Sequence, residues 1–267
     1  MNDITMPCLP HLAKKAQSTA IPAARKVASK ADRSTRLMSG PVTNKTRKAF
    51  NPNQENRVIN VYALSTPNSV RVPFALEELG VDNVLNAINL RKDEQKHADY
   101  LAMNPNGKVP VIVDPDGDKL FTLTESGGDP RLFRRKTGRL VPADAFGRAR
   151  VIEQMFFHLS GVGPAPGQLG FFKRQATEQI FYAIARFQTE AERVLKVLDG
   201  TLSRSAFAAG DAFTIADIAL FGWLWRREFA GNDFEGTPNI ARWYETVAAR
   251  LAVARAIKRV TALVRPA

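Results

Sequence analysis

From Val58 to Leu90 the chain reads VINVYALSTPNSVRVPFALEELGVDNVLNAINL, and this stretch decides its fold class. It begins with a short apolar run rich in strand-forming residues, Val58–Leu64, and ends with a second one, Val84–Leu90. Between them a loop with helix-start residues leads into Val70–Leu79, and Gly80 then supplies a helix end. A strand, a helix and a second strand in this order predict a parallel pair of strands.

The residues after Leu90 extend this plan with a short helix and a hairpin. Lys92–Met103 predicts the helix. Two apolar runs, Val109–Val113 and Lys119–Leu123, bracket Asp114–Asp118, whose Asp, Pro and Gly residues favour a turn, so we expect an antiparallel hairpin. Glu125–Gly127 then leads into a final helix of this half.

The second half of the chain predicts helices only. Residues 144–160 and 176–202 have helical periodicity, and Ile240–Leu251 predicts another helix. A further helix begins with a capping box, in which Thr214 caps the first turn and Asp217 returns the bond, and we assign both residues a structural role only. The apolar stripe of segment 176–202 consists of Ile180, Ile184, Phe187, Ala191, Val194, Leu195, Leu198 and Leu202.

The positive charge of the chain is concentrated near its N-terminus. The 267 residues hold 38 Lys and Arg against 26 Asp and Glu, a net charge of +12. Residues 1–56 contain ten of the basic and three of the acidic residues, which gives +7 there and +5 over the other 211 residues. Because this segment is also poor in aromatic residues, we expect a basic, disordered extension. An organelle-targeting segment and a nucleic-acid-binding arm are the alternatives, the second weakened by the lack of interleaved aromatic residues.

The remaining composition narrows the class of protein. With 45% hydrophobic residues the chain can bury a core, which excludes a wholly disordered or collagen-like protein. The single cysteine, Cys8, excludes an internal disulfide and a paired-cysteine motif, and with three dispersed histidines we expect no metal site. No run of about 18 apolar residues occurs, so we expect no membrane span and no membrane partner. Since the N-terminus has no continuous apolar stretch for a secretory signal, we expect a cytoplasmic protein.

Four short motifs occur in the order in which one enzyme superfamily has them. They are Ser65–Asn68 (STPN), Lys108–Pro110 (KVP), Glu125–Gly127 (ESG) and Phe213–Asp217 (FTIAD). With the order of elements given above, the chain resembles the cytosolic glutathione transferase superfamily over residues 57–260. The resemblance implies an α/β thioredoxin-like N-terminal domain at residues 57–139, an all-α C-terminal domain at residues 140–267, and a homodimer.

A narrower resemblance comes from Gly161–Gln168 (GVGPAPGQ) and Tyr182–Phe187 (YAIARF), which look like segments of the Nu-class bacterial glutathione-dependent disulfide-bond oxidoreductases. It implies glutathione as co-substrate and a small disulfide or electrophile as second substrate. Disulfide exchange would be the main reaction and glutathione transfer a further activity. The alternative is a non-catalytic regulatory or interaction protein of the same fold, which the atypical segment 128–136 supports because Gly and Pro stand there in an expected helix.

The resemblance makes Thr66 and Asn68 the catalytic residues, in contact with the sulfur of glutathione. Both lie between the first strand and the first helix, where unpaired amides and the helix dipole stabilise a thiolate. The alternative is that they only cap the helix. Because the chain has no cysteine at this point, glutathione has to supply the thiol chemistry.

The resemblance also implies a set of glutathione-binding residues, namely Lys108, Val109, Pro110, Glu125, Ser126 and Arg186. Val109–Pro110 would be a cis peptide, with the Val109 backbone pairing with the cysteinyl unit and Lys108 meeting the glycyl carboxylate. Glu125 and Ser126 would hold the γ-glutamyl end at a helix N-terminus. The alternatives are a solvated Lys108, a solvated Arg186 and a simple helix cap at Glu125 and Ser126.

Three further residues, Gln168, Phe171 and Phe172, are expected to wall the acceptor site. They lie in or next to the Gly- and Pro-rich segment 161–170, which we expect to interrupt the first helix of the second half as a loop. Aromatic walls suit an apolar second substrate, and both phenylalanines are equally compatible with the core.

Overall fold

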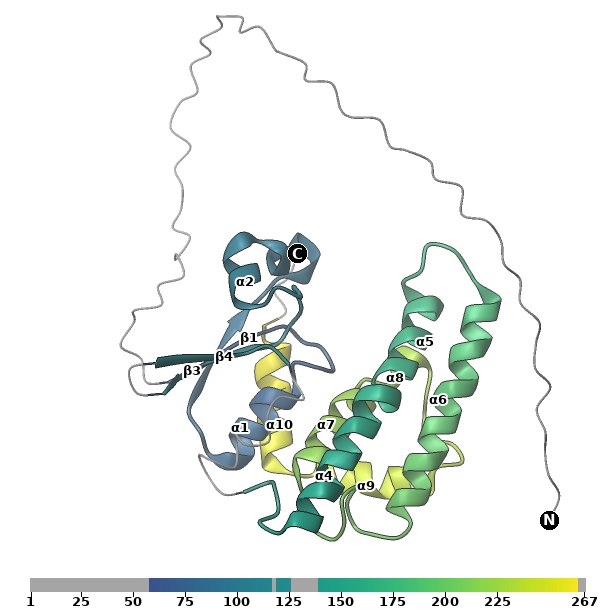
Figure 1. The fold of residues 1–267 in the computed structure, drawn as a ribbon. Helices are drawn as coiled ribbons and strands as arrows, with labels where there is room; N and C mark the ends of the chain where they lie inside the picture. Colours follow the sequence, from purple (N-terminus) through teal and green to yellow (C-terminus); the bar gives the residue numbers. More distant parts are fainter. Residues whose placement is uncertain (1–57, 117–118, 126–138, 264–267) are drawn as a thin grey trace, which may run out of the picture. The chain divides into compact units, whose positions relative to one another are not determined.

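The computed structural model of the chain describes residues 58–116, 119–125 and 139–263. In these residues a four-stranded sheet with its helices is followed by a helical part (Figure 1). The extension predicted at 1–56 and the atypical segment 128–136 lie outside the described residues. The domain boundaries at 56/57 and 139/140 therefore stay predictions.

The sheet has the strand order β2-β1-β3-β4. Its strands are β1 (Ile59–Ala63), β2 (Asn83–Ala87), β3 (Val111–Asp116) and β4 (Lys119–Leu123). β1 runs parallel to β2 and antiparallel to β3, and β3 is antiparallel to β4. This arrangement confirms the predicted parallel pair and hairpin, and it is thioredoxin-like.

The turn of the hairpin is shorter than the predicted Asp114–Asp118. β3 continues through Pro115, which lies opposite Leu120 of β4. β1 pairs only with Val111–Val113, so Pro115 lies beyond the end of β1. A proline, which cannot donate to a ladder, is tolerated where a strand has lost one of its neighbours.

The helices of the first half differ in how well the sequence predicts them. α1 (Arg71–Leu79) ends at Gly80, whose φ of 67° is the left-handed conformation that glycine adopts without strain. The predicted helix over 92–103 is wrong in its first part. Two 3-10 turns, η1 (Leu90–Lys92) and η2 (Glu94–Lys96), precede the short α2 (Ala98–Met103). Asp93 separates these turns with a φ of 53°, which the interior of an α-helix excludes.

A π-helical turn followed by a new helix stands where we expected a loop. Its elements are α4 (Ala145–Phe157), the π-helical turn η3 (His158–Val162), α5 (Pro164–Arg174), α6 (Phe181–Leu202), α7 (Ile215–Trp225), α8 (Arg227–Ala230), α9 (Pro238–Ala248) and α10 (Leu251–Thr261). Segment 161–170 thus runs from the end of η3 through Gly163 into α5, and Pro164 occupies the first turn of α5, where proline is favoured. The helix predicted over 240–251 is divided between α9 and α10.

Two predictions about the helical core are confirmed, one of them in part. The capping box of α7 is present, with Asp217 accepting from the backbone N–H of Thr214 at 2.9 Å and the Thr214 side chain facing the first turn. The same carboxylate accepts from Trp243 Nε1 at 2.8 Å and from the Ala208 amide at 2.9 Å. The stripe of α6 is buried from Ala191 onward, whereas Ile180 precedes the helix and is 43% exposed.

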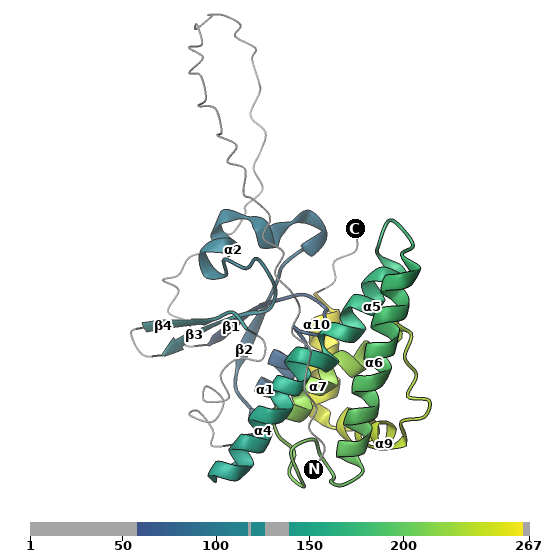
Figure 2. The ribbon, with the colours of Figure 1, turned by 45° about the vertical axis from the view of Figure 1, so that its right-hand side comes forward.

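α1 lies between the sheet and the helical part, next to α10 and α7 (Figure 2). Arg250, just before α10, forms a double hydrogen bond with Glu78 of α1. Gly222 of α7 lies so close to the loop before α1 that a Cβ there would be 2.4 Å from the carbonyl oxygen of Pro67. The loop that carries Thr66 and Asn68 is therefore held against α7. Within the described ranges no helix is long and apolar enough to cross a membrane.

Candidate functional site

The loop between β1 and α1 is folded by Thr66. Its Oγ1 accepts a hydrogen bond from the backbone N–H of Ser69 at 3.1 Å and lies 2.9 Å from the hydroxyl of Ser69, which is fully buried. The N-cap residue of α1 is Val70, and no side chain caps the helix. Thr66 therefore folds the turn that leads into α1 without capping the helix itself, and the role of Thr66 and Asn68 toward glutathione stays a prediction.

Asn68 is held by donors from two parts of the chain. Its Oδ1 accepts from Nη2 of Arg71 and, at 3.1 Å, from Nε1 of Trp223 on α7. Nη1 of the same arginine lies 2.6 Å from Nε2 of His158, the first residue of η3. Sequence analysis missed Arg71, His158 and Trp223 as members of the site. His158 lies 87 residues from Arg71 in the sequence, and Trp223 lies 155 residues from Asn68. No motif links these residues.

The buried arginine and histidine differ in charge. Burial lowers the pKa of Arg71 to about 10, against the opposing influence of the Glu125 carboxylate, so the guanidinium stays charged at neutral pH. Burial, with the neighbouring charge of Arg71, holds the pKa of His158 well below its usual 6.5, so the imidazole is neutral. Since the guanidinium only donates, Nε2 of His158 has to accept, and the ring proton sits on Nδ1.

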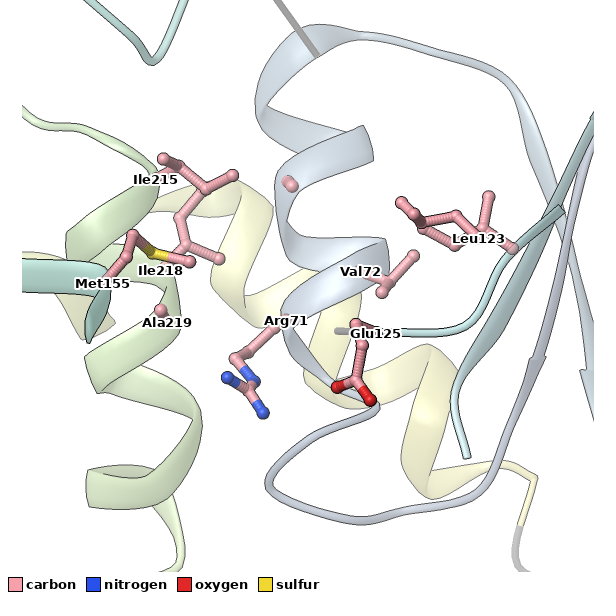
Figure 3. Close-up of a pocket in the computed structure, with 10 residues that line it drawn as sticks. Arg71, Val72, Leu123, Glu125, Met155, Ile215, Ile218 and Ala219 are labelled. Carbon is pink, nitrogen blue, oxygen red and sulfur yellow. The ribbon is translucent and has the colours of Figure 1, made fainter. Parts of the chain in front are cut away.

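Arg71 and Glu125 face a small pocket between α1, the β3–β4 hairpin and α7 (Figure 3). The guanidinium lies between α1 and α7, and the exposed carboxylate of Glu125 approaches it from the end of β4. The other residues that line this pocket are apolar, namely Val72, Ala75, Ile112, Leu123, Met155, Ile215, Ile218 and Ala219. Ser126 lies outside the described residues.

The Lys108–Pro110 segment is braced from behind. The Val109–Pro110 peptide is cis, which confirms this part of the prediction. The carbonyl oxygen of Lys108 accepts from the Tyr100 hydroxyl and from Nδ2 of Asn104, both at 2.8 Å. Burial raises the pKa of Tyr100 to about 12, so this hydroxyl remains a donor. The Lys108 side chain is exposed, and Pro110 is buried.

The residues expected to wall the acceptor site divide into two kinds. Gln168 and Phe171 are exposed on α5, the latter to 43%. Phe172 stacks on Phe187 of α6 with ring centroids 5.7 Å apart, so it belongs to the helix packing. Gly167 next to them would place a Cβ 2.7 Å from the ring of Trp223, which brings this turn of α5 close to the tryptophan that holds Asn68.

Arg186 is exposed on α6. Its charge adds to the hydrogen bond from Arg193 in lowering the pKa of Glu190, one turn further along the helix. Among the contacts of the described residues, Arg186 has no hydrogen bond with the Thr66–Asn68 loop. Its role in binding glutathione therefore stays a prediction. In the same residues no three His, Cys, Asp or Glu side chains come together in a group that could hold a metal ion.

Comparison with known proteins identifies both halves. Residues 66–127 match the family described as glutathione S-transferase, N-terminal domain, and residues 167–250 match its C-terminal domain. The disulfide-bond oxidoreductase YfcG of Escherichia coli is 33% identical over 205 residues, which cover 75% of this chain and 94% of that protein.

Solved structures give the same result. A glutathione transferase from Burkholderia graminis, with two glutathione molecules bound per subunit, superposes with a TM-score of 0.72 at 33% identity, covering 78% of this chain and 90% of that one. A glutathione transferase from Pseudomonas putida, with one glutathione disulfide bound per subunit, gives 0.71 at 29% identity, covering 78% and 94%.

Proposed function

This chain belongs to the glutathione S-transferase family, and from that premise we propose that it is a glutathione-dependent enzyme whose main reaction is thiol–disulfide exchange. The observation that carries the proposal is the state of Asn68. Its oxygen is occupied by Arg71 and Trp223, which leaves the amide nitrogen as the donor for a ligand. A hydrogen-bond donor at this loop suits a thiolate, and the chain has no cysteine after Cys8 to serve instead.

The proposed reaction needs two glutathione molecules. The thiolate of the first, held by the Thr66 hydroxyl and the Asn68 amide, attacks one sulfur of the substrate disulfide. The substrate S–S bond breaks, a mixed disulfide with glutathione forms, and the leaving thiolate takes a proton from water. The thiolate of the second glutathione then attacks the glutathione sulfur of the mixed disulfide, which releases the second substrate thiol and glutathione disulfide. Glutathione is oxidised, the substrate is reduced, and no protein sulfur takes part.

The binding residues follow from the same premise. We expect the Val109 backbone to pair with the cysteinyl unit, and Glu125 to meet the γ-glutamyl ammonium with Ser126 at its carboxylate. Lys108 and Arg186 are the exposed cations for the remaining carboxylates. The bracing of the Lys108 carbonyl by Tyr100 supports this assignment, because it fixes the backbone just before Val109.

Glutathione transfer to an electrophile is a second activity of the same site. The exposed ring of Phe171 and the exposed side chain of Gln168 favour it, since they offer an apolar and a polar wall on the helix whose Gly167 lies against Trp223. The non-catalytic alternative has the atypical segment 128–136 in its favour, and this segment lies outside the described residues.

We also propose a homodimer formed through α4 and β4. Apolar side chains that a monomer leaves in water recur along α4, among them Phe146 at 87% and Phe156 at 66% exposure. Leu120 and Phe121 on β4 are 52% and 45% exposed. Apolar residues gathered on two elements in this way favour a protein contact. Sedimentation of the Phe156→Glu variant at half the wild-type mass supports this contact, and an unchanged mass contradicts it.

The enzyme proposal is tested by two assays on the purified full chain. Glutathione-dependent reduction of hydroxyethyl disulfide and conjugation of chlorodinitrobenzene are measured for the wild type and for Thr66→Ala. Thr189→Ala is the matched control, because the hydroxyl of this exposed threonine donates to the Ala185 carbonyl of its own helix, α6. We expect disulfide reduction that Thr66→Ala lowers and Thr189→Ala leaves unchanged. Absence of both activities, together with no glutathione binding by calorimetry, would exclude the enzyme.

A further inference from the structure

The side chain that we propose to face the glutathione sulfur is oriented from the helical part of the chain. An asparagine amide has an oxygen and a nitrogen of almost the same shape, and only the nitrogen donates to a thiolate. Among the described residues, the two groups that hydrogen-bond to the Asn68 side chain are Nη2 of Arg71 and Nε1 of Trp223, and both are donors that cannot accept. The Asn68 side-chain atom that lies between these two donors therefore has to be the oxygen.

We propose that Arg71, His158 and Trp223 are positioning residues that lock the Asn68 amide with its nitrogen toward the thiolate of glutathione. This inference rests on the proposed function. A free amide would turn its oxygen toward the sulfur part of the time, which places a negative dipole end against a developing negative charge. Fixing the amide beforehand removes this cost from the reaction.

His158 keeps the arginine in place. Arg71 uses one terminal nitrogen for His158 and the other for Asn68, so the planar guanidinium is fixed at two points. A neutral imidazole suits this role because it offers Nε2 as an acceptor without repelling the arginine. The π-helical turn that begins at His158 interrupts the regular helix at this point, a feature that often accompanies functional positions.

The three positioning residues come from both halves of the chain. Arg71 belongs to α1, whereas His158 and Trp223 lie on η3 and α7 of the helical part. The thiolate donor of the first half is thus incomplete without the second half. The contact between the halves, tight at Gly222 against the Pro67 carbonyl, would transmit any displacement of α7 to the amide.

Trp223→Phe is the direct test, because it removes the N–H donor and keeps an aromatic ring. Trp225→Phe on the same helix is the matched control, since Trp225 packs under the Arg226 guanidinium at 4.3 Å. We expect Trp223→Phe to lower kcat for disulfide reduction about 5- to 30-fold, the effect of one lost hydrogen bond, with a smaller change in KM for glutathione. In the Trp223→Phe variant, the acid limb of the pH profile of kcat/KM for disulfide reduction also moves to higher pH. Trp225→Phe changes neither kcat nor the acid limb.

Arg71→Lys keeps the positive charge and loses the planar guanidinium that bonds both His158 and Asn68, whereas Arg71→Met loses both. The two variants therefore separate the effect of the two hydrogen bonds from that of the charge, and a check of their folding guards against an artefact. Each variant is first checked for an unchanged circular dichroism spectrum and for glutathione binding by calorimetry. Lysine keeps the charge without the planar fork, so we expect it to shift the acid limb in the same direction as Trp223→Phe. An active wild type whose Trp223→Phe variant loses thermal stability while its acid limb stays in place overturns this inference alone. A wild type with no glutathione-dependent activity overturns the proposed function and this inference together.

Discussion

Replacing Asn68 by aspartate should separate the stability of the site from its activity. The carboxylate has the shape of the amide, so one oxygen continues to accept from Arg71 and Trp223. Its bond to the buried guanidinium gains charge, and we expect the free energy of unfolding at pH 7 to equal or exceed that of the wild type. In the proposed complex, the other oxygen replaces the N–H donor that we expect to face the glutathione sulfur.

The magnitude follows from comparison with alanine at the same position. Asn68→Ala removes one hydrogen bond to a charged group, about 1.5–3 kcal/mol, which raises the pKa of the bound thiol by about 1–2. Asn68→Asp removes the same bond and adds a like charge, which raises that pKa further. The rate should therefore fall in the order Asn, Ala, Asp. Stability has a different order, because only alanine leaves Arg71 and Trp223 without their acceptor, at a cost of about 2 kcal/mol.

The assay pairs thermal unfolding with the pH profile of disulfide reduction for the wild type and both variants. Ultraviolet difference absorbance of the bound thiolate gives the pKa of the thiol directly. Asn68→Ala should be the least stable protein and Asn68→Asp the least active one. If aspartate reduces disulfides as fast as asparagine, the amide nitrogen does not face the sulfur and the reasoning is wrong. If the Asn68→Asp variant is as unstable as the Asn68→Ala variant, the side chain of residue 68 does not accept hydrogen bonds from Arg71 and Trp223.

Three further predictions concern stability. Asp217→Ala leaves buried backbone and indole donors unpaired and should lower the free energy of unfolding by about 4 kcal/mol, measured by urea titration; a loss below about 1 kcal/mol would contradict this. Since the folded pKa of His158 lies below its unfolded value, its contribution is complete above about pH 6.5 and is lost as the pH falls below it, so His158→Gln should flatten the stability profile there by at most about 1.4 kcal/mol per pH unit. Gly222→Ala should destabilise by about 1–3 kcal/mol, because its Cβ meets the Pro67 carbonyl, whereas Gly200→Ala, with open space around it, should be neutral or stabilising in calorimetry.

The sheet half could be predicted because its signals are local. Each strand contains a short apolar run, and the helix between β1 and β2 ends at a glycine in the left-handed conformation. The same locality explains the errors. Asp93 reads as an ordinary helix residue, yet its positive φ breaks the segment. The Gly- and Pro-rich segment 161–170 has the composition of a loop, but its glycines allow close packing, as Gly167 does against the ring of Trp223.

The candidate site could be predicted only where its residues lie close together in the sequence. Thr66 and Asn68 stand in one motif at a strand–helix junction, so their place was accessible from the sequence. What decides the use of Asn68 is which of its two side-chain atoms is occupied, and that depends on an indole 155 residues away. No periodicity encodes such a contact, because α7 is apolar after Asp217 and Trp223 stands there among residues of the core. Gly222, beside that tryptophan, is the one local trace, since a glycine inside an apolar helix indicates that another backbone comes close. The motif thus specifies the residue that we propose meets the sulfur, and the packing of the two halves specifies which of its two side-chain atoms is left for it.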